Sequence, residues 1–174
     1  GFARAGRAAR LLEAGVTAVA VSCHAADEAT EAQIALQAGA FATKRRGMER
    51  LVAAAEKAPH PVDLEARVVV METNRHQLSD IVDLVAALDF PTVRLAFVQP
   101  IARDLAGYHR VLPTYAAVRA PIAEALDHAA ARGLAWSLDN VPPCQLPDRP
   151  DLWPQLRLVP PAPQQAPTIP ALGD

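Results

Sequence analysis

Short hydrophobic runs that end in polar residues alternate along this chain with longer amphipathic segments. The runs are expected to form strands at residues 17–22, 65–72, 93–100 and 134–140. The apolar centre Val68–Met71 is typical of a strand that is buried on both faces. Between the runs, apolar residues recur with the helical period, most regularly from Leu78 to Leu88. The pattern therefore predicts an α/β fold.

The expected helices span residues 3–14, 43–57 and 113–132, with shorter ones after Asp27 and after Asn74 or Ser79. Asp27 is placed to cap the helix that follows it. Pro121 should kink or divide the last helix, because proline removes a helical hydrogen bond. Since helices separate the strands, the strands should run parallel.

Side chains that follow parallel strands meet at the carboxyl edge of the sheet, where ligands of α/β proteins gather. The polar residues expected on or near this edge are Ser22, His24, Thr73, Asn74, Gln99 and Asn140.

Composition adds limits to this interpretation. The chain has 174 residues, of which 51% are hydrophobic, enough for one domain with a sizeable core. A net charge of -2 gives no global attraction to nucleic acid or to an anionic membrane. No apolar run is long enough to span a membrane. The two cysteines predict reduced thiols and a cytoplasmic location.

Most of the 16 prolines follow Val141, and this shift in composition predicts a domain over residues 1–144 followed by a loosely ordered tail over residues 145–174. Trp153, Leu156 and Leu158 are the expected anchors of that tail.

Several candidate residues admit more than one role. Ser22 and His24 suit hydrogen bonding to a ribose, a carboxylate or a phosphate, or to nearby backbone. Thr73 and Asn74 suit a ligand or a helix cap. A Cys23–His24 nucleophile pair is disfavoured, because adjacent strand residues point to opposite faces.

Metal binding has little support in the sequence. The later histidines lack the spacing of a zinc site, and Cys144 is expected to be structural or incidental as a lone thiol.

Five motifs, taken in order, resemble the second half of the core of radical S-adenosylmethionine (SAM) enzymes. They are Val-Ser-Cys-His24 with Asp27; Gly39-Ala-Phe41 with Thr43, Gly47 and Leu51; Val-Met-Glu-Thr73-Asn74 with Leu78; Phe97-Val-Gln-Pro100; and Pro142-Pro-Cys144. The resemblance covers residues 1–144. It implies the later strands of a partial, TIM-like (β/α)6 barrel.

The resemblance also implies a chemistry. Such enzymes hold a [4Fe-4S] cluster on three cysteines and cleave SAM reductively to start radical reactions, here on an unknown substrate. By resemblance, Ser22 and His24 would lie near the SAM ribose, and Thr73 and Asn74 would line the next strand end. Gln99 would lie near the adenine or the substrate. The resemblance identifies no catalytic residue.

Two expected motifs are absent from this sequence: the Cys-x-x-x-Cys-x-x-Cys loop that binds the cluster and the Gly-Gly-Glu-Pro strand that holds the SAM amino group. Without three thiolates the chain alone should not catalyse the reaction. It is expected to be a fragment that begins just after the third barrel strand. The open edge of strand 17–22 would then need the missing half or a partner to cover it, and the isolated chain should be poorly soluble or dimeric.

Two other classes remain open. A metal-independent barrel lyase or aldolase would use the same edge, but would usually need a lysine at a strand end. A non-catalytic relic of the fold would bind a partner, for instance through its proline-rich tail.

Overall fold

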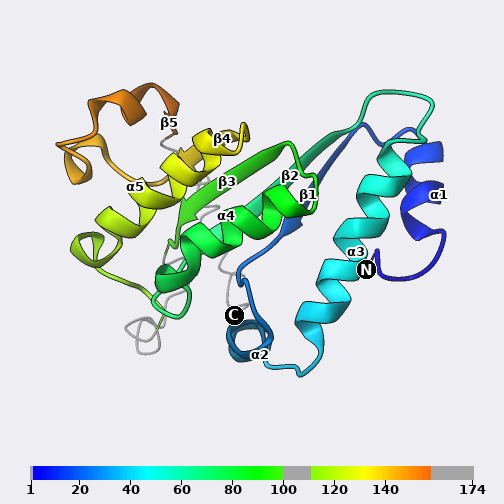
Figure 1. Ribbon diagram of the computed structural model, residues 1–174, viewed down its shortest axis with the longest axis horizontal. Helices are drawn as coiled ribbons and strands as arrows, with labels where there is room; N and C mark the ends of the chain where they lie inside the picture. Colours follow the sequence, from blue (N-terminus) through cyan, green and yellow to red (C-terminus); the bar gives the residue numbers. More distant parts are fainter. Residues whose placement is uncertain (1, 100–110, 158–174) are drawn as a thin grey trace, which may run out of the picture.

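The computed structural model describes residues 2–99 and 111–157, and these form a single parallel sheet with helices (Figure 1). The strands are β1 (Ala18–Ser22), β2 (Asp63–Val70), β3 (Thr92–Phe97), β4 (Ala135–Asp139) and β5 (Leu156–Arg157). They lie side by side in sequence order, and every neighbouring pair is parallel. The α/β fold with parallel strands is therefore confirmed.

In the described residues, five α-helices connect or flank these strands: α1 (Arg7–Glu13), α2 (Glu28–Ala35), α3 (Ala40–Ala55), α4 (Leu78–Ala87) and α5 (Tyr115–Ala131). Short 3-10 helices are η1 (Arg75–Gln77), η3 (Pro143–Gln145) and η4 (Pro150–Gln155). Helix α5 continues through Pro121, so the proline does not divide it.

The apolar core lies on one face of the sheet. In β2 the side chains of Leu64, Ala66, Val68 and Val70 are buried, whereas the residues between them are at least partly exposed. Helices α4 and α5 lie side by side over this face (Figure 1), and their apolar side chains join those of α1 and α3 in one cluster. The prediction that β2 is buried on both faces was wrong. The residues on its other face, which include Glu65 and Arg67, are at least partly exposed.

That other face carries ionic side chains, and we call it the polar face. It is formed by Ala20 and Ser22 of β1, Glu65 and Arg67 of β2, Arg94 of β3, and Ser137 and Asp139 of β4, which alternate with core residues along their strands. The strand register places Ser22, Arg67, Arg94 and Ser137 in one row across the sheet.

Arg94 is the centre of the ionic network on the polar face. Its Nη2 lies 2.7 Å from Oε2 of Glu65, and its Nη1 lies 3.0 Å from Oδ2 of Asp139. Arg67 donates to the second oxygen of Glu65. Burial alone would raise the pKa of Glu65, but the hydrogen bonds from Arg94 and Arg67 outweigh it and lower this pKa. Glu65 therefore stays ionised near neutral pH.

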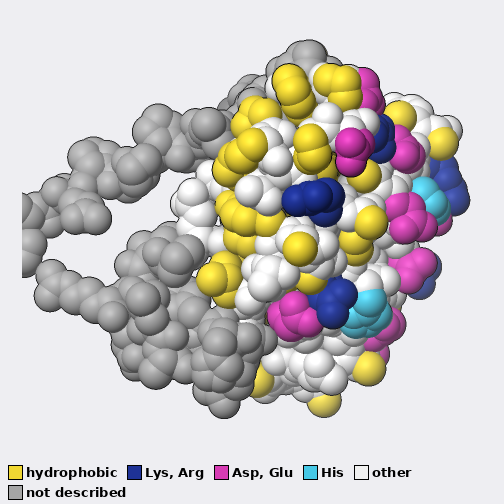
Figure 2. Space-filling view, turned by 90° about the vertical axis from the view of Figure 1, so that its left-hand side faces the viewer, with side chains coloured by type: hydrophobic (Ala, Val, Ile, Leu, Met, Phe, Trp, Pro, Cys, Tyr) yellow, Lys and Arg dark blue, Asp and Glu magenta, His cyan; other side chains and the backbone are white. Residues whose placement is uncertain are grey.

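The described fold continues past Cys144 to Arg157, where β5 pairs with β4. Leu146 and Leu152 are buried and anchor this segment, whereas Trp153 is 43% exposed and its indole N–H donates to the Leu146 carbonyl. Leu158 lies outside the described residues. The face that carries α5 and this segment shows many hydrophobic side chains with a few charged ones among them (Figure 2). Among the described residues, no helix is both long and apolar enough to cross a membrane.

Strand β1 pairs only with β2 among the described residues, so its other edge has no strand partner in this part of the chain. We expect the isolated chain to associate through this edge and to elute from a sizing column ahead of an 18.5 kDa monomer. Ala18→Lys should weaken the association about tenfold, because lysine on an edge strand disfavours further pairing. Ala29→Lys, at an exposed position of α2, adds the same charge away from this edge and should change the association little. A sharp monomer peak for the unchanged chain would contradict this expectation.

Candidate functional site

The candidate site lies where β1 and β2 end at the carboxyl edge of the sheet. Cys23 makes the last regular backbone contact between the two strands, its N–H donating to the Arg67 carbonyl. Beyond it, the side chains of His24 and Asn74 take over the hydrogen bonding. These two residues were predicted from sequence to lie at this edge, and the structure brings them together.

His24 continues the ladder between β1 and β2 with its ring. The backbone N–H of Val69 donates to Nδ1 of His24 over 3.2 Å. Because Nδ1 accepts this bond, a neutral ring carries its proton on Nε2. Burial, reinforced by the charge of Lys44, lowers the pKa of His24 to about 4. The ring is therefore neutral at pH 7, and it presents an Nε2–H donor.

Asn74 is completely buried and ties three backbone groups together. Its Nδ2 donates to the carbonyls of His24 and Val69, each over 2.8 Å. Its Oδ1 accepts from the N–H of Met71, also over 2.8 Å. Asn74 stands at the N-cap position of η1, but its side chain makes no capping hydrogen bond there. In this structure the Asn74 side chain holds the backbone of His24 in place. Contact between Asn74 and a ligand stays a prediction.

A second tie between the same two loops was not predicted from sequence. Gln77 is buried, its Nε2 donates to Asp27, and its Oε1 accepts from the N–H of Ala26 over 3.3 Å. Asp27 also accepts from the N–H of Thr30 over 2.8 Å, which confirms it as the cap of α2 and is the main reason its pKa is lowered. The loop that contains His24 is thus held at both ends.

The other predicted site residues make fewer described contacts. Ser22 is exposed at the end of β1 on the polar face, Thr73 is half-buried in the turn after β2, and Gln99 is exposed after β3. Asn140 has a left-handed backbone with φ 64°, and its carbonyl accepts from the Tyr115 hydroxyl. Of these four residues, Ser22 is the nearest to His24 in the sequence, two positions before it.

Neither cysteine thiol takes part in the His24–Asn74 hydrogen bonding. Cys23 is buried on the core side, and burial raises its pKa to about 11, so its thiol is protonated and unreactive at pH 7. Cys144 is exposed in η3, after β4. No group of three histidine, cysteine or acidic side chains in the described part of the chain is arranged to hold a metal ion.

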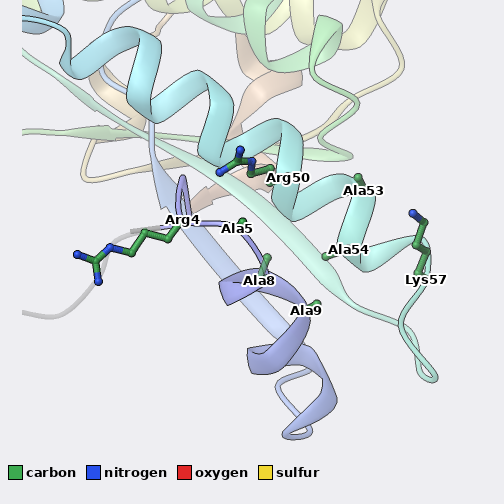
Figure 3. A pocket seen from close by; sticks show the side chains of 9 residues that line it. Arg4, Ala5, Ala8, Ala9, Arg50, Ala53, Ala54 and Lys57 are labelled. Carbon is green, nitrogen blue, oxygen red and sulfur yellow. The ribbon is translucent and has the colours of Figure 1, made fainter.

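A separate hollow of about 300 Å³ lies between α1 and α3 (Figure 3). Small alanine side chains line it, and Arg4 and Lys57 point away from one another, so these cations do not converge on one ligand. The hollow lies at the end of α3 that leads into the start of β2. The start of β2 is at the opposite edge of the sheet from His24. We assign it no part in the candidate site.

This chain matches no protein-family description, and no curated protein matches it significantly.

Proposed function

We propose that this chain is part of a cytoplasmic radical SAM enzyme and that the carboxyl edge of its sheet binds the nucleoside part of SAM. The observation that carries the proposal is the neutral His24 ring, which is fixed through Nδ1 and carries its proton on Nε2, two residues after the exposed Ser22. A sheet whose strands follow sequence order, with its core on one face, is also what part of a (β/α)6 barrel would show.

The residues present fit a nucleoside. Ribose hydroxyls accept from an N–H donor and exchange hydrogen bonds with a serine hydroxyl. His24 would supply the donor and Ser22 the hydroxyl, while Asn74 and Gln77 keep the loop in place. Thr73 and Gln99 would extend the contacts toward the adenine or the substrate. Bound SAM would supply the organic radical on which such enzymes depend only after it receives an electron from a [4Fe-4S] cluster.

The residues present do not fit a [4Fe-4S] cluster. Three thiolates are required, and the sequence has two cysteines. Cys23 is buried and protonated, and Cys144 lies after another strand. A cluster would need ligands from a longer chain or a partner, so we derive no catalytic step through it. We expect binding without turnover from the isolated chain.

Isothermal titration calorimetry on the full chain tests the proposal. SAM and 5′-deoxyadenosine should bind with similar dissociation constants of about 1 mM. The two should be alike because no Gly-Gly-Glu-Pro strand is present to hold the methionine part. Methionine alone should not bind. Ser22→Ala should weaken nucleoside binding about three- to tenfold through the lost hydrogen bond.

Thr17→Ala is the matched control, since it removes an exposed hydroxyl just before β1, at the opposite edge of the sheet. Its binding should equal that of the unchanged chain. Failure of both nucleosides to bind, or equal binding by Ser22→Ala, would overturn the proposal and favour a non-catalytic relic of the fold.

A further inference from the structure

Two buried oxygen atoms on the polar face lack hydrogen-bond partners. They are Oγ of Ser137 and Oδ1 of Asp139, and neither has a partner among the described residues. Both residues are buried, at 7% and 6% exposure. Buried polar atoms are normally hydrogen-bonded, so two unpartnered ones call for an explanation. Because they lie two residues apart on β4, their side chains point to the same side of the sheet.

The charges around these atoms are balanced. Arg94 bridges Glu65 and Asp139, and Arg67 donates to Glu65, so two guanidinium groups face two carboxylates. Asp139 uses only Oδ2 in the bridge, which leaves Oδ1 as an acceptor. An added ion would leave this set with an uncompensated charge, whereas a neutral hydrogen-bonding group would not.

The polar face becomes more accessible toward β1. Along the row that contains Ser137, Arg94 has a side-chain exposure of 21%, Arg67 has 57%, and Ser22 is exposed. The same row therefore runs from a buried end at β4 to an accessible end at β1. A small molecule that approaches from β1 would meet charged side chains first and the unpartnered atoms last.

We propose that the polar face at β3 and β4 binds a neutral small molecule through a hydroxyl group, which donates to Oδ1 of Asp139 and hydrogen-bonds the Ser137 hydroxyl. A hydroxyl both donates and accepts, so it satisfies these two atoms whichever way the Ser137 proton points. An ammonium group donates but cannot accept, and a carboxylate cannot donate to Asp139. The simplest neutral ligand class that meets both requirements is an alcohol or a vicinal diol. This site goes beyond the proposed nucleoside site at Ser22 and His24.

Nuclear magnetic resonance titration of the full chain tests this site. The probe is cis-1,2-cyclopentanediol, and its dimethyl ether serves as the matched ligand that cannot donate. The diol should shift the backbone amide signals of Ser137 and Asp139, and the ether should bind at least about tenfold more weakly. Ser137→Ala should weaken diol binding about threefold or more. Its urea midpoint should be unchanged or higher, because the lost hydroxyl has no partner.

Ser22→Ala separates this site from the nucleoside site. It should leave the diol-induced shifts at Ser137 and Asp139 in place even where it weakens nucleoside binding. Equal shifts from the ether, larger shifts from acetate or methylammonium, or a lowered urea midpoint for Ser137→Ala would each overturn the inference. The last result would mean that the hydroxyl has a structural partner such as a buried water molecule.

Discussion

Replacing Asn74 with alanine should lower the free energy of unfolding by about 3 kcal/mol, because three hydrogen bonds are lost at about 1 kcal/mol each. The substitution would leave the carbonyls of His24 and Val69 and the N–H of Met71 without this partner. Asn74 is completely buried, so water cannot easily replace it. Urea denaturation followed by circular dichroism measures the change. The loss is large beside the roughly 5–15 kcal/mol typical of a whole domain.

Thr73→Ala is the matched control, since Thr73 is the half-buried neighbour of Asn74 and its side chain makes no hydrogen bond to the described residues. It should cost well under about 1 kcal/mol, as surface changes usually do. Asn74→Asp adds a sharper comparison: it keeps the acceptor for Met71 but replaces the donor with a carboxylate that faces two carbonyls. It should therefore destabilise at least as much as alanine. Equal losses for Thr73→Ala and Asn74→Ala would show that Asn74 does not hold the two loops together.

The arrangement of strands could be predicted from the sequence because each step depends on local pattern. Apolar runs such as Val68–Val70 mark the strands, and the helices between them require parallel pairing. Asp27 could also be predicted as a cap, because capping depends on residues three apart. These features need no knowledge of distant contacts.

The roles of the residues at the carboxyl edge could be predicted only in part. The pattern places His24 and Asn74 at strand ends, but their mutual contact joins residues 50 positions apart. Nothing local distinguishes an asparagine that binds a ligand from one that holds backbone groups of two loops. Gln77 was missed for the same reason, because its partners Ala26 and Asp27 also lie far along the chain.

The polar face does have a local signal in the sequence. Leu64-Glu-Ala-Arg-Val68 alternates apolar and charged residues, which is typical of a strand with one polar face. The apolar run that follows it favoured burial on both faces instead. The bridge from Arg94 to Asp139 could not be predicted, because it depends on the register between β3 and β4.

The folded chain should lose stability as the pH falls from 6.5 to 4 because of His24. In the unfolded chain this histidine has its ordinary pKa of 6.5, and in the folded chain its pKa is about 4. Below pH 6.5 the unfolded state therefore binds the proton more readily, so acid favours unfolding. The difference corresponds to about 3 kcal/mol once the pH reaches 4. Protonation of Nδ1 would also break the bond from Val69.

Urea midpoints between pH 7.5 and 4.5 measure this loss, and the shift of the His24 ring signal gives its pKa directly. His24→Gln keeps an acceptor for Val69 but cannot titrate, so it should remove most of the decline. His60→Gln is the matched control. The Pro61 and Leu12 carbonyls raise the pKa of half-buried His60, so protonation of this ring favours the folded state in acid and its removal cannot abolish the decline. An unchanged decline in His24→Gln, or a His24 pKa near 6.5, would contradict the neutral, fixed ring on which the proposed nucleoside site depends.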